Sequence, residues 1–319
     1  MGMKKDFTAG ADDAGRRLDR VLRILLDDLP LPAIYGALRR GRIRVNGRRA
    51  EQSYRVVEGD LIQVDESLLA GFSGPQQARA EKEMTAEPGL AEALAGMTLS
   101  RSADLLFLNK PRGIQTHGDA SLDELVREVE GARSRISLAF SPAPLHRLDR
   151  NTSGIVTFAL SIAGAHAFTA ALRRGAVRKT YLALLTGRLE GEERWVDRLA
   201  RDDASRTSSV SEDGALAMTG VLPLLTDKGL TLARVELGTG RTHQIRAQAA
   251  AHGHPLAGDV KYGGGRGPLG YLLHAWILDL PELGLPGLPA RIVAALPRDA
   301  GRFLRETFGN DALESAGLQ

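Results

Sequence analysis

The sequence predicts an α+β protein, made of a small N-terminal α/β module and a larger domain built on a mostly antiparallel sheet. The chain has 319 residues, more than one average domain needs, so two domains are expected. Beyond residue 100, strand-like and helical runs alternate irregularly, without the regular βαβ rhythm of a parallel sheet. Hydrophobic residues make up 43% and charged residues 25% of the chain, which is typical of globular proteins.

Composition also divides the chain into segments. Between Glu66 and Ser100, small and polar residues predominate and two prolines interrupt any long periodicity, which predicts a flexible linker with one helix near Leu90 to Ala95. We therefore expect the small module over residues 14–66, the linker over 67–100, the larger domain over 101–309 and a tail over 310–319.

The module is expected to begin with an amphipathic helix that ends at Pro30. One face of this helix carries the apolar residues Leu18, Val21, Leu22, Leu25 and Leu29. A second, short helix is expected to start near Pro32 and to end at Gly41, because glycine suits the position after a helix.

A short strand and a basic cluster follow the second helix. Ile43 and Val45 alternate with arginines, and Asn46-Gly47 is the strongest short-range signal for a hairpin turn. The cluster lies within eleven residues that contain no acid and consists of Arg39, Arg40, Arg42, Arg44, Arg48 and Arg49. Such a cluster is typical of phosphate contact, because the guanidinium group matches phosphate oxygens at two points; a solvated basic surface is the alternative.

The larger domain shows apolar runs of strand length and two helical patterns. Strands are expected at 105–108, 155–160, 181–185 and 230–237. Helices are expected at 163–174 and 242–252, and Ser161 and Gly175 are plausible caps of the first.

Several classes of site are excluded by what the sequence lacks. The chain has no cysteine, which excludes disulfides, thiolate nucleophiles and cysteine zinc sites and indicates a reducing compartment such as the cytoplasm. No apolar run approaches the roughly 20 residues that span a bilayer. The histidines lack zinc-site spacing, the glycine run 263–267 lacks a phosphate-loop lysine, and no serine lies in a Gly-x-Ser-x-Gly turn. We therefore expect no metal, no nucleotide cofactor and no membrane partner.

The most informative segment is HRLDRNTSG, residues 146–154, just before an apolar strand. It places Asp149 among three groups that are or can become cations: His146, Arg147 and Arg150. On these residues alone, Asp149 is either a turn or cap residue, or a carboxylate that the nearby positive charges keep ionised as a nucleophile or base.

The module resembles the S-four type of RNA-binding domain. The similar stretches are RRLDRVLRILL, LRRGRIRVNGRRA and VVEGDLIQV. In that family the second helix and first strand form the RNA-facing surface, so the resemblance implies that Arg40, Arg42 and Arg44 contact RNA.

The larger domain resembles the RluA-type family of pseudouridine synthases over roughly residues 105–280. The motifs that carry the resemblance are, in chain order, NKPRGIQTHG, HRLDRNTSG, RKTYLALLTG and GRTHQIRAQAAAHGHPLAGDVKYGG. The resemblance implies an isomerase that converts uridines of structured RNA to pseudouridine without a cofactor. With the S-four module attached, large-subunit ribosomal RNA is the expected substrate and partner.

The resemblance also implies roles for single residues. Asp149 matches the essential aspartate of the family, Tyr181 its active-site tyrosine, and Arg246 the basic residue that pairs with the aspartate. Ile245 matches the apolar residue before that arginine, and it is assigned to substrate binding. Without the resemblance, Tyr181 would be interpreted as a core ring with a hydrogen-bonded hydroxyl and Arg246 as a surface cation.

Two further residues of the central motif are assigned to substrate binding by the same resemblance. Arg147 matches an arginine that fills the stack vacated when the target base is extruded, and His146 precedes it. Two other functions stay open: a non-catalytic RNA-binding ribosome-assembly factor, and a glycoside hydrolase, which normally needs a second carboxylic acid near Asp149.

Overall fold

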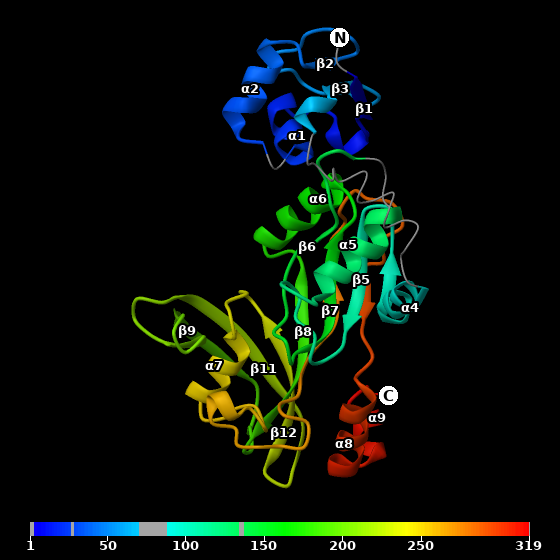
Figure 1. Ribbon diagram of the computed structural model, residues 1–319. Coiled ribbons are helices and arrows are strands. Elements are labelled where there is room, and N and C mark those ends of the chain that lie inside the picture. The colour runs from blue at the N-terminus through cyan, green and yellow to red at the C-terminus, as the bar shows by residue number, and fades with distance from the viewer. Residues whose placement is uncertain (1–2, 27–28, 70–87, 134–136, 319) are drawn as a thin grey trace.

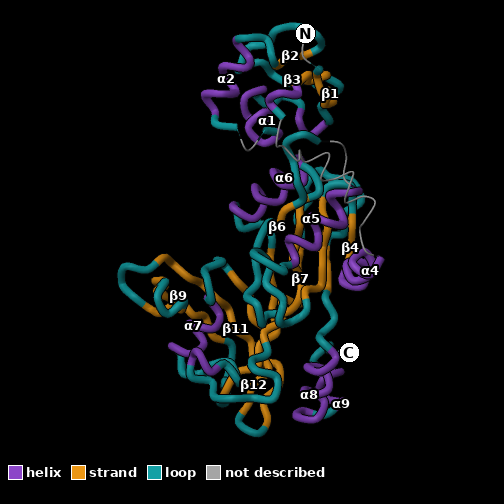
Figure 2. Tube along the Cα trace, viewed as in Figure 1, coloured by secondary structure: helices purple, strands orange, loops and turns teal. Residues whose placement is uncertain are grey.

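The computed structural model describes residues 3–26, 29–69, 88–133 and 137–318. Figure 1 shows a small N-terminal module at one end of a long sheet domain, and Figure 2 shows the same arrangement by element type. Among the described strands, the only parallel pairing is between β7 and β13, and the other pairings are antiparallel. The predicted α+β fold is therefore confirmed.

The N-terminal module, here residues 3–69, combines a three-stranded sheet of order β1-β3-β2 with two helices. Its elements are β1 (Lys4–Thr8), η1 (Ala11–Asp13), α1 (Leu18–Leu25), α2 (Leu31–Arg39), β2 (Ile43–Val45), β3 (Leu61–Asp65) and η2 (Glu66–Leu68). Asn46 and Gly47 both have positive φ, at 51° and 77°, as the predicted tight turn requires. The structured part starts earlier than residue 14, because Phe7 of β1 is buried in the core of the module.

In the described residues, the larger domain is built on one sheet of eleven strands. They are β4 (Thr98–Arg101), β5 (Leu105–Lys110), β6 (Ala143–Pro144), β7 (Ser153–Ala159), β8 (Arg178–Thr186), β9 (Glu193–Asp202), β10 (Thr207–Val210), β11 (Ala215–Asp227), β12 (Leu230–Leu237), β13 (Leu273–Asp279) and β14 (Arg291–Val293). Their main order is β10-β9-β11-β12-β8-β13-β7-β5-β4, with β6 paired to β7 and β14 paired to β13.

Helices cover this sheet on both faces. They are α4 (Pro88–Met97), α5 (Leu122–Arg133), α6 (Ile162–Arg173), α7 (Gln244–Ala251), η3 (Val260–Tyr262), α8 (Arg298–Phe308) and α9 (Asn310–Ser315). The first four residues of β5 are all apolar because both faces of the strand are buried. Leu106 and Leu108 pack in one core cluster with α5, whereas Leu105 and Phe107 pack in another with α6.

The elements that the sequence predicts are present. The four predicted strands lie within or overlap β5, β7, β8 and β12, and the two predicted helices correspond to α6 and α7. Ser161 caps α6 by accepting a hydrogen bond from the backbone nitrogen of Gly164 at 2.9 Å, and Gly175 follows the helix with a φ of 71°.

Two predicted boundaries differ from the structure. Residues 70–87 of the predicted linker lie outside the described residues. Residues 88–101 form α4, which contains the helix expected near residues 90–95, and β4, which was not predicted. Leu94 of α4 is buried in the largest core cluster, and β4 pairs with β5, so both elements belong to the larger domain. The predicted tail is also folded, because Leu313 and Leu318 pack in a core cluster beside α8. Both predictions relied on average composition. Each segment contains a few spaced apolar side chains that are buried, and an average over the segment does not show them.

Candidate active site

Asp149 lies in a turn between β6 and β7. The backbone nitrogen of Thr152 donates to the carbonyl oxygen of Asp149 at 3.1 Å, so the turn interpretation is correct for its backbone. Thr116 braces the preceding residue: its hydroxyl donates to the Leu148 oxygen at 3.1 Å and accepts from the Leu148 nitrogen at 3.2 Å. The Asp149 side chain remains 19% exposed, so the turn presents it to solvent at the edge of the core.

The Asp149 carboxylate faces two basic side chains of the segment that opens α7. Arg246 Nη1 donates to Asp149 Oδ2 at 3.1 Å, and His243 Nε2 lies 3.6 Å from the same oxygen. Within the part of the chain that the structure describes, Asp149 Oδ1 has no hydrogen-bond partner. One carboxylate oxygen is thus anchored and the other is available to a substrate.

Arg246 is itself held on every side. Asp259 accepts from its Nε at 2.7 Å and from its Nη2 at 2.9 Å, a two-point pair with a buried carboxylate. The guanidinium carbon lies 4.8 Å from the ring centre of Tyr262 and 4.6 Å from that of Tyr271. Burial, the largest single effect, lowers the pKa of Arg246, but the hydrogen bonds to Asp259 and the charges of Tyr271, Asp259 and Asp149 together outweigh it, so the net pKa is raised. Arg246 therefore stays a cation beside Asp149.

A buried lysine fixes the loop on the other side of Asp149. Lys110 is fully buried at the end of β5, and its Nζ donates to three carbonyl oxygens: Pro111 at 3.0 Å, Ile114 at 2.7 Å and Arg150 at 3.1 Å. Burial lowers the pKa of Lys110 to about 8, against a smaller opposing effect of Asp149. This ammonium group joins the loop after β5 to the turn that carries Asp149.

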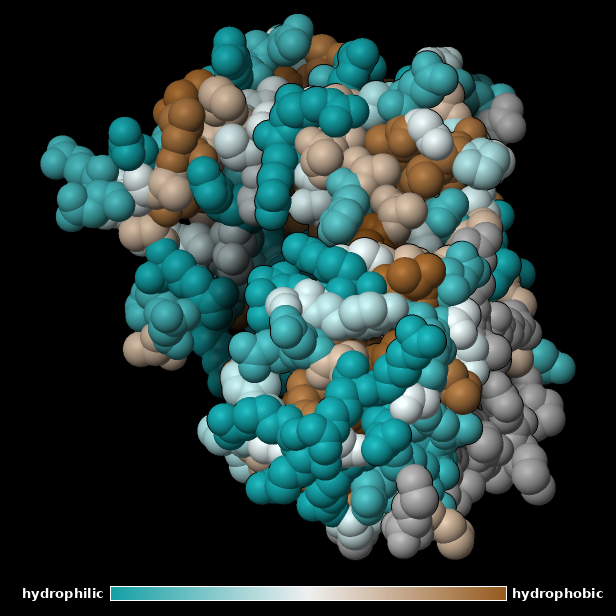
Figure 3. All heavy atoms as spheres, turned by 90° about the horizontal axis from the view of Figure 1, so that it is seen from above, coloured by the Kyte–Doolittle hydropathy of each residue, from teal (hydrophilic) through white to brown (hydrophobic). Residues whose placement is uncertain are grey.

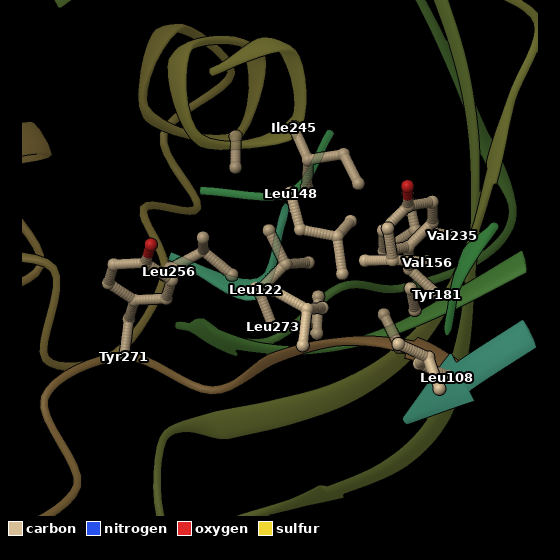
Figure 4. Close-up of a cluster of buried hydrophobic side chains, with 14 of the residues drawn as sticks. Leu108, Leu122, Leu148, Val156, Tyr181, Val235, Ile245, Leu256, Tyr271 and Leu273 are labelled. Carbon is tan, nitrogen blue, oxygen red and sulfur yellow. The ribbon is translucent and has the colours of Figure 1, made fainter. Parts of the chain in front are cut away.

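Tyr181 reaches the same place from the middle of β8. Its ring is buried in the largest core cluster, and Figure 4 shows it packed beside Val235 and Val156, with Ile245 and Leu148 in the same cluster. Among the described residues its hydroxyl has no hydrogen-bond partner, although the side chain lines the cleft that contains Asp149. The sequence alone favoured a hydrogen-bonded hydroxyl; the structure instead leaves this hydroxyl open to the cleft.

The ionisation of Tyr181 follows from its surroundings. Burial raises its pKa above that of an ordinary tyrosine, and the charge of Asp149 raises it further. The phenol is therefore protonated at neutral pH.

The cleft around these groups is large and basic. It encloses about 1090 Å³ and is lined by Asp149, Tyr181 and several cations, which include Arg147, Arg173, Lys179, Arg194, Arg234 and Arg241. Arg147 is exposed and also lines two smaller hollows beside Asp149, of about 70 Å³ and 310 Å³. It thus stands where three hollows meet at the carboxylate, a position that suits a side chain that replaces an extruded base.

The other predicted substrate-binding residues are placed differently. The His146 ring stacks near Phe168, and its Nε2 accepts from the Thr157 nitrogen at 3.1 Å, so in the neutral ring Nδ1 carries the proton. Burial lowers the pKa of His146 to about 3, with a further contribution from Lys179. Ile245 is buried in the core and also lines the smallest hollow beside Asp149.

The module arginines form a separate surface. Arg42 pairs with Asp65 at 3.7 Å and bonds to Ser67, whereas Arg44 donates to the carbonyl oxygens of Gly41 and Gly47 at 3.3 and 3.1 Å. Arg40 lies over α2 and is exposed. Figure 3 views the molecule from this end and shows a mainly hydrophilic surface with smaller hydrophobic areas.

Sequence reasoning missed several residues of the site, namely His243 as a neighbour of Asp149, together with Asp259, Tyr262, Tyr271 and Lys110. His243 has a φ of 54° before α7, and its Nδ1 lies 2.8 Å from the Tyr262 hydroxyl oxygen. Burial lowers the pKa of His243, against an opposing effect of Asp149. Four of these five residues lie inside the quoted motifs, so their place in a motif was the feature of the sequence that could have identified them.

The described residues hold neither a metal cluster nor a membrane-spanning helix. In the described ranges, no group of three or more His, Asp or Glu side chains is arranged to hold a metal ion. No helix in the same ranges has the length and apolar character needed to cross a membrane.

Comparisons with known proteins agree with this geometry. A family described as RNA pseudouridylate synthase matches residues 104–251, and the S4 domain, the S-four type named above, matches residues 16–62. The solved structure of human RNA Pseudouridylate Synthase Domain Containing 1 is similar with a TM-score of 0.55 and 25% identity, over 67% of this chain and 86% of that one.

Curated bacterial proteins are similar over most of the chain. Ribosomal large subunit pseudouridine synthase C of Salmonella typhi is 32% identical over 316 residues, covering 94% of this chain and 95% of that protein. The protein of the same name from Yersinia pestis is 33% identical over 261 residues, covering 81% of this chain and 79% of its own. The chain therefore belongs to the family of RNA pseudouridine synthases of the RluA type that carry an S-four domain.

Proposed function

We propose that this RNA pseudouridine synthase acts on large-subunit ribosomal RNA and that Asp149 is its catalytic carboxylate. The proposed substrate is supported by the names of the bacterial relatives, whose similarity extends over both parts of the chain. An RNA-binding module beside a cleft rich in arginine and lysine suits a long polyanion. Ribosomal RNA and the absence of cysteine both favour the cytoplasm as the place of action.

The reaction rearranges bonds within one nucleotide. The bond between the ribose and the uracil nitrogen breaks, the base turns, the ribose carbon bonds to ring carbon five, and that carbon loses its proton while the freed nitrogen gains one. Asp149 Oδ1 has no partner among the described groups, which supports a role on the sugar either as a nucleophile or as a proton acceptor. Arg246 holds the other oxygen and offsets the charge.

Tyr181 and Arg147 complete the proposed site. The ring of Tyr181 offers an apolar surface beside Asp149. Its hydroxyl is protonated at neutral pH, so in the final step it acts as a relay: it accepts the proton of ring carbon five while it passes its own proton to water or to a carboxylate such as Asp149. Arg147 lies at the junction of three hollows and is assigned to hold the place of the extruded base. His146 and Ile245 shape the walls of this space.

A hydrolytic reaction fits the site less well. Asp259 is the carboxylate that shares Arg246 with Asp149, and both of its oxygens bind Arg246. Asp259 is therefore not free to act as the acid that protonates the leaving group in a glycoside hydrolase.

The observation that carries the proposal is the anchored Asp149 beside an unpartnered Tyr181 hydroxyl in one basic cleft. Replacing Asp149 by Asn keeps the shape of the side chain and removes its charge. We expect RNA affinity to persist and release of tritium from uridine labelled at ring carbon five to fall at least about 1,000-fold. Pseudouridine maps of ribosomal RNA from cells that carry only D149N should lose the sites that the wild type modifies.

Asp227 provides the matched control, because it is a half-exposed acid at the end of β11, next to the turn that leads to β12. D227N should release tritium at the wild-type rate. D149N activity within tenfold of wild type would remove Asp149 from the chemistry. If D149N loses tritium release but the pseudouridine map of ribosomal RNA from cells that carry it is unchanged, the proposed substrate is contradicted.

A further inference from the structure

The N-terminal module and the catalytic domain meet at a buried carboxylate. Asp13, in η1, is fully buried, and its oxygens accept from three groups of the catalytic domain: Ser137 Oγ at 3.0 Å, the Leu138 nitrogen at 2.8 Å and the Ala139 nitrogen at 3.0 Å. The Gly10 nitrogen of the module donates to the same side chain at 2.9 Å. A buried carboxylate needs several donors, and most of its donors come from the other domain.

Apolar and backbone contacts surround this carboxylate. Leu138 and Ala139 are buried in the hydrophobic cluster of the module, not in that of the catalytic domain. Arg16 Nη1 of the module also donates to the Ala139 oxygen at 2.8 Å. The segment 137–139 therefore packs as part of the module, although it belongs to the catalytic domain by sequence.

A second contact ties the module to α6. Asp12 Oδ1 accepts from the backbone nitrogen of Ile162, the first residue of α6, at 3.1 Å. This nitrogen is one of those that a helix leaves without an internal partner, and a carboxylate at a helix N-terminus is also favoured by the helix dipole. We call the contacts of Asp12, Asp13 and Arg16 with residues 137–139 and 162 the joint.

Both chain segments that leave the joint lead to the active-site cleft. Helix α6 has 12 residues, about 18 Å of rigid helix, and its last residue, Arg173, lines the cleft that contains Asp149. The segment after Ala139 passes through β6 and reaches Arg147, which lines the same cleft. Figures 1 and 2 show α6 and β6 below the module, on the way to β7 and β8.

We propose that the joint sets the distance between the RNA-binding surface of the module and the catalytic cleft, with Asp13 as its positioning residue. An RNA bound at both surfaces then presents to Asp149 only the uridine that lies at the matching distance from the module. A rigid connection favours this one geometry, whereas independent domains would sample many. The inference rests on the proposed function for its RNA, but the geometry can be tested without any RNA.

The first test measures the geometry directly. Because the chain has no cysteine, single cysteines can be introduced as spin-label sites, one in the module at Glu58 and one in the catalytic domain at Glu190, both exposed. The otherwise unchanged chain should give one narrow distribution of label distances in electron paramagnetic resonance. Adding D13A should broaden it. A distribution that is already broad before D13A is added would overturn the proposal.

The second test measures specificity. With D13A, KM for a structured ribosomal RNA fragment should rise about tenfold while kcat at saturation stays unchanged, because the reacting groups are untouched. The pseudouridine map should show less product at the wild-type site and new product at nearby uridines. An unchanged map together with an unchanged KM would refute a positioning role for Asp13, whereas loss of activity in D149N tests only the proposed function.

Asp60 supplies the matched control within the module. It is buried, and its carboxylate accepts from Asn46 Nδ2 at 2.7 Å, the Tyr54 hydroxyl at 2.9 Å and the Val57 nitrogen at 2.8 Å, all inside the module. D60A should lower the thermal stability of the module and leave the label distances narrow. If D60A broadens the distances and changes the map as D13A does, the effect is loss of the module fold and the role assigned to Asp13 is wrong.

Discussion

At the scale of single residues, Arg246 joins the separate parts of the site. It touches Asp149, a two-point carboxylate partner and two aromatic rings, so its position depends on four other side chains. A long flexible cation seldom keeps one conformation unless it is bound in this way, and a fixed cation costs no reorganisation during a reaction. The carboxylate of Asp149 therefore has a fixed orientation before any substrate is bound.

Tyr181→Phe tests whether the open hydroxyl takes part in the chemistry. The ring still fills the core and no internal hydrogen bond is lost, so the free energy of unfolding should change by less than about 1 kcal/mol. Turnover should fall severely, because no group replaces the hydroxyl at the final proton transfer. Urea denaturation and tritium release from labelled RNA measure the two effects.

Tyr271→Phe is the matched control for this substitution. Tyr271 lies in the same cluster, and its hydroxyl oxygen is 3.4 Å from Thr152 Oγ1, while its ring stacks on Arg246. Removing that hydroxyl should leave most of the activity. Equal losses in both variants would show that Tyr181 acts only through packing.

The sequence predicted some of these residues and missed others for a physical reason. Asp149, Tyr181 and Arg246 stand in motifs whose resemblance to a family is specific. The contact between Arg246 and Asp259 spans a helix end and a loop, and the two-ring stack depends on how that loop folds back. Neither the periodicity of apolar residues nor the spacing of charges in the sequence indicates that the chain folds back in this way.

At the scale of elements, the close approach of β7 and β13 supports the turn that carries Asp149. Gly154 pairs with Ala275 in the parallel register between these strands, five residues after Asp149. Its φ is 107°, and a Cβ there would lie 2.2 Å from the Ala275 oxygen. Only glycine fits this crossing, which belongs to the motif HRLDRNTSG.

Gly154→Ala should therefore destabilise the catalytic domain by at least about 3 kcal/mol, because both strain and a backbone clash oppose it. Gly96→Ala is the control: this glycine lies within α4, has no positive φ, and a Cβ there would meet nothing within 4 Å. It should stabilise the protein by up to about 1 kcal/mol. Chemical denaturation of both variants gives the comparison, and a G154A protein as stable as wild type would contradict the packing described.

Elements with strong local signals were predicted well, and the others were not. Helix α6 has caps at both ends and an apolar face, and β12 is rich in apolar residues, so both were predicted nearly to the residue. Strands β9 and β10 carry exposed polar residues at many positions and draw their stability from neighbouring strands. Whether these strands form depends on their neighbours in the sheet, so their own sequences predict them only weakly.

At the scale of the whole molecule, two basic surfaces belong to one chain: the arginine cluster of the module and the cleft around Asp149. The predicted linker suggested two independent domains. Asp13 and Asp12 of the module, however, accept hydrogen bonds from residues more than 100 positions further along the chain. Such long-range contacts have no periodic or compositional signature. The two surfaces can therefore be expected to bind one RNA together.

Replacing Arg40, Arg42 and Arg44 together by Ala tests the contribution of the module surface to this shared binding. Each phosphate contact that is lost removes close to one unit from the slope of log affinity against log salt, because fewer counterions are released. The slope should fall by roughly two to three, and RNA affinity at low salt should fall with it. The rate at saturating RNA should persist, since the reacting groups lie in the other domain.

Replacing Arg20, Arg23 and Arg55 removes the same charge from the module outside the cluster and should change the slope much less. Equal slopes for wild type and the first variant, measured between low and moderate salt, would show that the cluster is a solvated surface and that the cleft alone binds the RNA.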